Sequence, residues 1–200
     1  MTEFRLKVPE DNNRVSEIKA GDVLFVTGDI VIARDQAHKK LLEPDKFTEE
    51  LVGLPIFHCG PIAQKKGEEW TIVAGGPTTS TRMDALTPPI LEKYKTKIII
   101  GKGGLGEVGK KGLANFGAVY SEFTGGASAL AVSKIVKVKK RLLEELGPTE
   151  LVDLGSERLR TTTRNARPPR QRHKENRNKP SRRETRHSSK DLRLGLREFA

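Results

Sequence analysis

The stretch GDVLFVTGDIVIARDQAH, residues 21–38, contains two short β-branched runs followed directly by a helical pattern. The runs DVLFV (22–26) and DIVIA (29–33) are predicted strands, separated by a Thr-Gly pair that favours a connection between them. In the segment 34–43 apolar side chains recur at helical spacing, so a helix is predicted to follow the second strand. Strands that lead into helices are typical of α/β proteins.

The same alternation continues through most of the chain. Further strands are predicted at LPIFH (54–58), WTIVA (70–74), KIII (97–100) and AVYSEF (118–123). Helices are predicted over 84–94 and over 128–146, and a Gly-Pro pair ends the second of them. The sequence therefore predicts an α/β body with mixed sheets.

The net charge of +11 is concentrated at one end of the chain. Residues 1–156 carry 22 Lys and Arg against 21 Asp and Glu, whereas residues 157–200 carry 15 against 5. We therefore predict a folded domain over 1–156 and an Arg-rich tail over 157–200. Two explanations of the tail stay open: a disordered basic extension, or the product of a shifted reading frame. A slip of a single base turns the Lys and Glu codons AAR and GAR into AGR, which encodes Arg.

The cysteine content and the hydropathy restrict the class of protein. Cys59 is the only cysteine, which excludes an internal disulfide and a metal site built from several cysteines of this chain. No apolar run approaches the roughly 20 residues that cross a membrane. The amino-terminal segment MTEFRLKVPEDNN lacks the apolar core of a secretion signal. These features predict a cytoplasmic protein without membrane contact.

Polar side chains gather after several predicted strands. The first grouping, ARDQAH, contains Arg34, Asp35 and His38, and its spacing places Arg34 and His38 about one helical turn apart on one face. Such a group is a candidate for anion binding and proton transfer. A helix cap with a surface charge is the alternative interpretation.

The second grouping is GGPTTSTRMD, residues 75–84, in which four consecutive hydroxyl side chains precede an arginine. Capping a helix needs a single hydroxyl, so the density of hydroxyls favours a ligand site. The two glycines let the backbone approach a ligand closely, and Thr78 and Thr79 present hydroxyls to it. Arg82 can bind a carboxylate in bidentate fashion.

The third grouping is IIIGKGGLG, residues 98–106, where Lys102 follows a predicted strand and could bind a phosphate or a carboxylate. It is not a P-loop, because the GxxxxGK[ST] spacing is missing. Its I-I-G-x-x-G pattern is also that of a KH RNA-binding module, which with the basic tail gives an alternative function. Two features argue against the KH interpretation. The segment KTKIII before the loop is strand-like, and we expect the glycines at 106, 109 and 112 to break a following helix.

Together these motifs resemble a known enzyme family. They match, in order, the smaller β subunit of two-subunit class I fumarases and tartrate dehydratases. The matching segments are GDVLFVTGDIVIARDQAH, LPIFHCGPI, AGGPTTSTRMD, IIIGKGG, FGAVYSEFTGGASAL and a predicted helix ending in ELG. The same module is the C-terminal domain of single-chain class I fumarases. The resemblance covers residues 15–150 and implies a swivelling β/β/α domain.

The resemblance implies a hydro-lyase that is active only with its partner subunit. The reaction is the reversible hydration of fumarate to L-malate, as in the tricarboxylic acid cycle, or the dehydration of a related hydroxy-diacid such as tartrate. The implied cofactor is a [4Fe–4S] cluster ligated by the larger α subunit and not by this chain, which contributes no metal ligand. Nucleic acid contact is expected only non-specifically, through the tail.

Roles for individual residues follow from the same resemblance. Thr78 matches the residue that transfers the proton, and we expect Asp35, His38 or a cation to activate it, because a threonine hydroxyl is too weak a base unaided. The residues implied in substrate binding are Arg34, Thr79, Arg82 and Lys102. A third hypothesis, that the chain is a scaffold that stabilises its partner, predicts full activity without these side chains.

Overall fold

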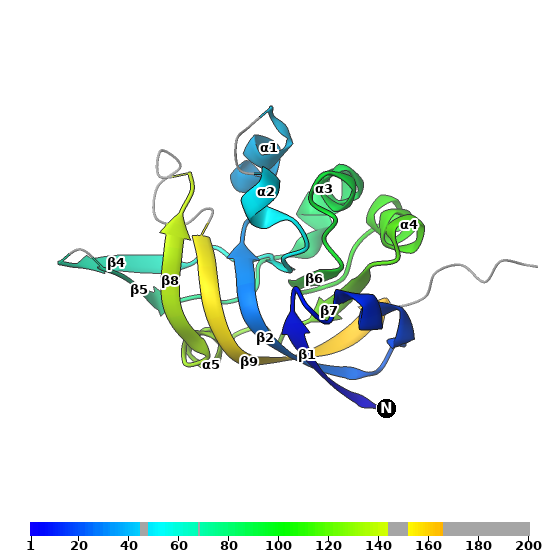
Figure 1. Cartoon of the computed structure of the whole chain (residues 1–200), viewed down its shortest axis with the longest axis horizontal. Helices are drawn as coiled ribbons and strands as arrows, with labels where there is room; N and C mark the ends of the chain where they lie inside the picture. The colour runs from blue at the N-terminus through cyan, green and yellow to red at the C-terminus, as the bar shows by residue number, and fades with distance from the viewer. Residues whose placement is uncertain (45–47, 68, 144–151, 166–200) are drawn as a thin grey trace, which may run out of the picture. The chain divides into compact units, whose positions relative to one another are not determined.

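The computed structural model describes residues 1–44, 48–67, 69–143 and 152–165 of the chain (Figure 1). Seven strands form one sheet in the order β1-β2-β3-β6-β7-β9-β8. Their bounds are Glu3–Val8 (β1), Val23–Ile32 (β2), Ile56–Phe57 (β3), Ile98–Gly101 (β6), Val119–Glu122 (β7), Ile135–Arg141 (β8) and Val152–Asn165 (β9). The sheet curls on itself, since β9 pairs with both β7 and β2. A separate two-stranded sheet consists of β4 (Ile62–Lys66) and β5 (Glu69–Ala74).

The strands β1, β2, β3, β6 and β7 run parallel to one another, and β9 runs antiparallel to β2, β7 and β8. The α/β class with mixed sheets predicted from the sequence is therefore confirmed. The carboxyl ends of β2, β3, β6 and β7 lie at one edge of the sheet, where ligands of α/β proteins commonly bind.

Helices connect the strands, and those at Asp35–Leu42, Thr87–Tyr94 and Glu107–Phe116 lie together on one face of the sheet (Figure 1). The α-helices are Asp35–Leu42 (α1), Thr48–Leu51 (α2), Thr87–Tyr94 (α3), Glu107–Phe116 (α4) and Ser128–Val132 (α5), and the 3-10 helices are Asn12–Glu17 (η1) and Ser80–Leu86 (η2). The helices α1, α3 and α4 contribute Leu41, Ile90 and Leu113 to one apolar core. Strand β6 serves two cores, because Ile99 packs in this one and its neighbours Ile98 and Ile100 in the other. This explains why the strand is apolar at every position.

The two strands predicted over 22–33 are a single strand, β2, so the predicted connection between them is wrong. The pairing of β2 with β9 shifts register between Val26 and Gly28 instead of turning. Gly28 has φ of +123°, and a Cβ there would lie 2.3 Å from the carbonyl oxygen of Val8. Glycine therefore lets β1 and β2 approach closely while the strand continues through an irregularity.

The helix predicted over 128–146 is also wrong for the described part of that segment. Only Ser128–Val132 is helical, and Ile135–Arg141 forms β8, antiparallel to β9. The run IVKVKKR contains three β-branched residues and lacks a helical apolar face, so pairing with β9 prevails over the apparent helical spacing. The ELG end of the prediction lies outside the described residues.

Three further elements differ from the sequence prediction. The polar segment 60–69 contains β4, which pairs with β5, and the chain begins with β1. Helix α4 forms despite Gly109 and Gly112, so the expectation that these glycines break a helix is wrong. A Cβ at Gly109 would lie 2.5 Å from Asp84 Oδ1, and one at Gly112 would lie 2.8 Å from Pro88 Cγ. These glycines therefore allow α4 to pack closely against η2 and α3.

The predicted boundary between domain and tail falls within β9. The backbone of that strand continues past residue 156 to Asn165, and the remainder of the predicted tail, 166–200, lies outside the described residues. The described residues all belong to the unit Met1–Arg170, one of two into which the chain divides. No helix within the described parts of the chain has the length and apolar character needed to span a membrane.

Candidate functional site

Loops from the carboxyl ends of three parallel strands meet at one edge of the sheet. Arg34 and Asp35 follow β2, His58 follows β3, and Lys102 follows β6. Each of these side chains is brought to the same edge because the strands are parallel and adjacent in the order β2-β3-β6.

The hydroxyl-rich segment after β5 is held across these loops by its backbone. The amide of Thr78 donates to the carbonyl oxygen of His58 at 2.7 Å, and the amide of Ser80 donates to that of Lys102 at 3.0 Å. Thr79 and Lys102 form an isolated parallel bridge. The three groupings identified in the sequence, 34–38, 75–84 and 98–106, therefore come together at one place.

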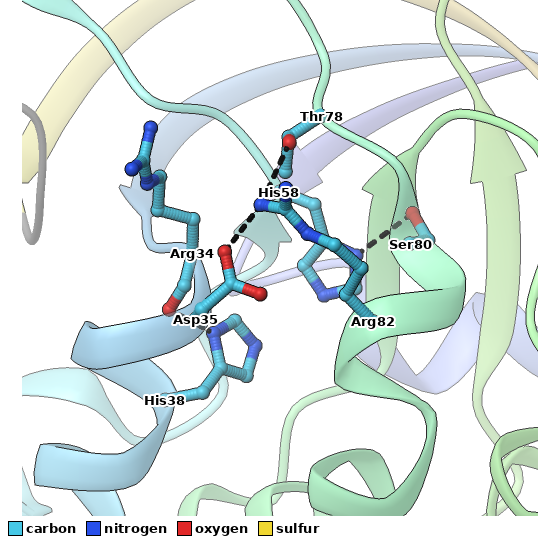
Figure 2. Close-up of polar contacts among 7 residues, drawn as sticks. All are labelled: Arg34, Asp35, His38, His58, Thr78, Ser80 and Arg82. Carbon is cyan, nitrogen blue, oxygen red and sulfur yellow. Dashed lines mark hydrogen bonds and ion pairs between the residues drawn. The ribbon is translucent and has the colours of Figure 1, made fainter.

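Arg82 connects two of these groupings (Figure 2). Its Nη2 donates to Thr78 Oγ1 at 3.2 Å and forms an ion pair with the carboxylate of Asp35. The side chain of Arg82 is 50% exposed and that of Asp35 31% exposed, so a solute can reach this pair. A cationic donor on the Thr78 oxygen stabilises an alkoxide at that position, which is what a threonine acting as a base requires.

Two further cations, Arg34 and Lys102, belong to the loops that follow β2 and β6. Arg34 is half-buried and fits against Gly60, where a Cβ would lie 2.6 Å from Arg34 Nη1. Lys102 is half-buried and lines a hollow of about 310 Å³ together with Glu122, Phe123 and Thr124. Each of the three groupings that meet here thus contributes a cation, which fits a ligand with more than one negative charge.

His38 lies beneath Arg34. It is fully buried, and its Nδ1 donates to the carbonyl oxygen of Arg34 at 2.9 Å, which leaves Nε2 as the unprotonated nitrogen. Burial lowers the pKa of His38 from 6.5 to about 4, so the ring is neutral near pH 7. Its ring packs against that of His58 with centroids 5.0 Å apart. The role of His38 in activating Thr78 stays a prediction, and its observed contacts support the main chain at Arg34.

Asp84, at the end of the hydroxyl-rich segment, serves a structural purpose. Its Oδ1 accepts a hydrogen bond from the amide of Gly109 at 2.8 Å, in the first turn of α4. An acidic side chain at a helix amino terminus satisfies free amides and interacts favourably with the helix dipole. The segment that carries Arg82 is therefore fixed to α4.

The groups beneath the hydroxyl-rich segment were not predicted from the sequence. Ser80 Oγ lies 2.9 Å from His58 Nδ1 and 2.9 Å from the hydroxyl of Tyr120, and all three residues are buried. Ser80 was one of four similar hydroxyls, and neither His58 nor Tyr120 stood in a pattern that marks a site. The signal that could have found Ser80 is its position between Thr79 and Arg82.

The described residues hold no cluster of metal-ligating side chains. Cys59 is fully buried, and burial raises the pKa of its thiol to about 12, so it remains protonated. Among the residues that the structure describes, no group of three or more His, Cys, Asp or Glu side chains could hold a metal ion.

The KH-like alternative finds no support in the structure. A KH loop joins two helices, whereas here Gly101 ends strand β6. Within the described residues the GKGG segment instead forms one wall of the site that contains Thr78 and Arg82.

Comparison with known proteins gives the family. The family model of the fumarase C-terminus matches residues 1–160. The chain is 35% identical over 146 residues to the L(+)-tartrate dehydratase subunit beta of Escherichia coli K12, covering 72% of this chain and 73% of that protein. It is 36% identical over 143 residues to the "Putative L(+)-tartrate dehydratase subunit beta" of Methanocaldococcus jannaschii, covering 69% of this chain and 73% of that protein.

A longer relative shows the same module within a larger protein. The chain is 35% identical over 146 residues to the "Putative fumarate hydratase class I" of Geobacillus stearothermophilus, covering 72% of this chain but only 28% of that protein. The hydro-lyase resemblance drawn from the sequence motifs is confirmed by these matches. The chain therefore belongs to the fumarase C-terminus family, as a chain of the β-subunit type found in class I fumarate hydratases and L(+)-tartrate dehydratases.

Proposed function

We propose that this hydro-lyase subunit binds a small dicarboxylate at the edge formed by Arg34, Arg82 and Lys102, and that Thr78 transfers the proton. The substrate is L(+)-tartrate, dehydrated to oxaloacetate, or the fumarate and L-malate pair. The observation that carries the proposal is the contact of Arg82 with both Thr78 and Asp35.

Each residue has a distinct part in this proposal. In the dehydration direction a C–H bond and a C–O bond of the diacid break, and water leaves. Thr78 first loses its own hydroxyl proton to solvent, and the guanidinium of Arg82 at 3.2 Å stabilises the resulting alkoxide. Thr78 Oγ1 then accepts the proton from carbon and returns to the neutral hydroxyl. Lys102 and Arg34 bind the substrate carboxylates, and Thr79, which is exposed and pairs with Lys102 through the backbone, donates a hydrogen bond to the substrate. Asp35 holds Arg82 in place.

We propose that the site is completed by a larger iron–sulfur α subunit. The names of the relatives, subunit beta, imply a partner for those proteins. A [4Fe–4S] cluster would supply a Lewis acid for the hydroxyl that leaves. Its cysteine ligands would come from the partner, because Cys59 is buried and protonated here. With fumarate as substrate the complex would serve the tricarboxylic acid cycle, in the cytoplasm.

The test is anaerobic co-expression of the full chain with an iron–sulfur α subunit, followed by assays with L(+)-tartrate, fumarate and L-malate. We expect turnover that the α subunit alone lacks. Thr78→Val is expected to lower kcat by roughly 100-fold to 1,000-fold, the range seen when a group that contacts the reacting centre is removed. Lys102→Ala is expected mainly to raise KM.

Matched variants separate this proposal from a scaffold function. Thr87→Val removes a buried hydroxyl that donates to Met83, and Lys110→Ala removes an exposed lysine of α4 that pairs with Glu107. Both are expected to retain wild-type turnover. Unchanged turnover in Thr78→Val and Lys102→Ala, with the complex assembled and its cluster loaded, would favour the scaffold.

A further inference from the structure

A buried set of hydrogen bonds converges on one atom behind the site. Ser80 Oγ lies 2.9 Å from Tyr120 Oη, 2.9 Å from His58 Nδ1 and 3.2 Å from the amide nitrogen of Lys102. These partners come from β7, from the end of β3 and from the end of β6. Ser80 itself follows Thr78 and Thr79 directly, so this single hydroxyl joins the hydroxyl-rich segment to three strands.

The hydrogen bonds of this set run in one direction when each hydroxyl proton is used within the set. The amide of Gly104 donates to Tyr120 Oη at 3.2 Å, and Tyr120 donates its own proton to Ser80. Ser80 also accepts from the amide of Lys102, which uses both of its acceptor positions. Its single proton therefore goes to His58 Nδ1, and the proton of the neutral His58 ring lies on Nε2.

The neighbouring histidine complements this arrangement. His58 Nε2 carries a proton, whereas His38 Nε2 does not, because Nδ1 of His38 donates to the carbonyl oxygen of Arg34. Both Nε2 atoms are buried and have no hydrogen-bond partner among the described residues. The two rings pack edge to face with centroids 5.0 Å apart. One ring therefore carries an N–H donor at Nε2, that of His58, and the adjoining ring carries an acceptor at Nε2, that of His38.

Gly101 leaves the space in which the side chains of Ser80, Tyr120 and His58 meet. A Cβ at Gly101 would lie 1.9 Å from Ser80 Oγ, 3.0 Å from Tyr120 Oη and 3.2 Å from His58 Nδ1. Glycine at this strand end thus allows the three polar groups to converge. The backbone strengthens the same link, since the amide of His58 donates to the carbonyl oxygen of Ile100 at 2.7 Å.

We propose that Tyr120, Ser80 and His58 are positioning residues, whose one-directional hydrogen-bond chain holds Thr78 and Thr79 in register with Lys102. This inference rests on the proposed function, because it explains how the proton-transferring hydroxyl and a substrate-binding cation keep their separation. Beyond this chain, the ring of His58 packs against that of His38, whose Nδ1 donates to the carbonyl oxygen of Arg34. None of these groups touches the substrate. They act by fixing the residues that do.

The kinetic test compares two tyrosine variants in the assembled complex. Tyr120→Phe removes the hydroxyl that donates to Ser80, and Tyr94→Phe removes an equally buried hydroxyl that donates to Leu41 on α1. A displacement of about 1 Å at a catalytic group can cost roughly 100-fold in rate. We expect Tyr120→Phe to lower kcat by about 10-fold to 100-fold with KM changed less than about threefold, and Tyr94→Phe to lower kcat less than about twofold.

A second pair of variants tests His58 through rescue. The side-chain oxygen of asparagine can accept the Ser80 proton where Nδ1 does, so His58→Asn keeps the chain of hydrogen bonds that His58→Leu breaks. His58→Asn is expected to retain at least about 10-fold more activity than His58→Leu. Equal losses in these two variants, or equal losses in Tyr120→Phe and Tyr94→Phe, would show that the network only stabilises the fold.

The tautomers provide a readout that needs no turnover. In the complex labelled with ¹⁵N-histidine, His58 is expected to be protonated on Nε2 and His38 on Nδ1 at pH 7, each signal assigned by its loss in the corresponding asparagine variant. Ser80→Ala is expected to shift the His58 signals and leave those of His38 nearly unchanged. A proton on Nδ1 of His58 would overturn the proposal even if the complex is active. An inactive complex with the expected tautomers would instead point to a wrong substrate.

Discussion

Arg82 reaches across to Asp35, a residue 47 positions earlier in the chain, and the same guanidinium nitrogen donates to Thr78. The contact joins a 3-10 helix to the start of α1 above the carboxyl ends of the parallel strands. It is partly exposed, so it contributes little to folding, because exposed ion pairs are typically worth about 0.2–1 kcal/mol. Its value lies in orienting a cation on the Thr78 hydroxyl.

Asp35→Asn is therefore expected to separate activity from stability. The free energy of unfolding should fall by less than about 1 kcal/mol, whereas kcat should fall by more than about 10-fold, because Arg82 loses the charge that fixes it. Urea unfolding and steady-state kinetics measure the two effects. The double variant Asp35→Asn, Arg82→Gln should be no less active than Arg82→Gln alone, since the two side chains act as a unit.

The exposed pair of Lys110 and Glu107 gives the control for this prediction. Glu107→Gln removes a surface ion pair on α4 and should change neither quantity. Strictly additive losses in the Asp35 and Arg82 double variant would contradict the proposed coupling.

Gly101→Ala is expected to damage both folding and activity. The added Cβ would lie 1.9 Å from Ser80 Oγ, which forces the strand end and the hydroxyl-rich segment apart. Overpacking of this kind typically costs about 1–3 kcal/mol in the free energy of unfolding. The matched change for stability is Gly75→Ala, because the added Cβ would lie no closer than 3.5 Å to Cys59 Sγ, and the free energy of unfolding should stay nearly unchanged. Similar thermal midpoints for the two variants would show that the site tolerates this displacement.

The buried histidines predict a loss of stability in mild acid. Burial lowers the pKa of His38 from 6.5 to about 4 and that of His58 well below 6.5, so both are neutral in the folded state. Between pH 6.5 and about 4 the unfolded chain binds protons that folded His38 does not bind, and each such group lowers stability by up to about 1.4 kcal/mol per pH unit. Above pH 6.5 both states are neutral and this dependence disappears.

Urea titrations at pH 7.5, 6.5, 5.5 and 4.5 measure this slope. His38→Asn should reduce the slope between pH 6.5 and 4.5, because it removes one group whose protonation differs between folded and unfolded chains. An identical slope in the variant would mean that His38 is already charged in the folded protein.

Cys59 is expected to be inert in the folded chain. It is fully buried and its thiol has a pKa raised to about 12, whereas thiolate is the form that reacts with disulfide reagents. A thiol-reactive disulfide reagent at pH 8 should label the native protein slowly and the urea-unfolded protein at once. Because the chain has a single cysteine, the label count is unambiguous. Rapid stoichiometric labelling of the native form would show that the loop after β3 opens.

The sequence predicted the parts of the fold in which local pattern and long-range pairing agree. Helix α1 and strands β6 and β7 lie where their periodicity places them. The prediction of a helix over Ile135–Arg141 is wrong because this segment becomes a strand only through its pairing with β9. No local sequence pattern indicates that pairing. Helix α4 was not predicted, because the space that Gly109 and Gly112 share with Asp84 and Pro88 exists only in three dimensions.

The candidate site shows the same division. Thr78, Arg82 and Lys102 stand in motifs that indicate a ligand site from the local sequence, whereas the motif of Arg34 alone is equally that of a helix cap with a surface charge. Tyr120 could not be found in this way, because a tyrosine inside an apolar strand has the pattern of a core residue. Only the structure brings Tyr120 and His58 together at Ser80, where the hydroxyl of Tyr120 donates to Ser80 Oγ.

Strand β9 has a consequence for how the protein is made. It pairs with β2, β7 and β8, so the curled sheet cannot close until the last described residues have been synthesised. During translation the earlier parallel strands emerge first and expose an unpaired edge along β2 and β7 to other nascent chains. Ribosomes that pause before codon 152 would prolong this exposure, so translation speed over the codons for β9 should influence how much of the protein aggregates.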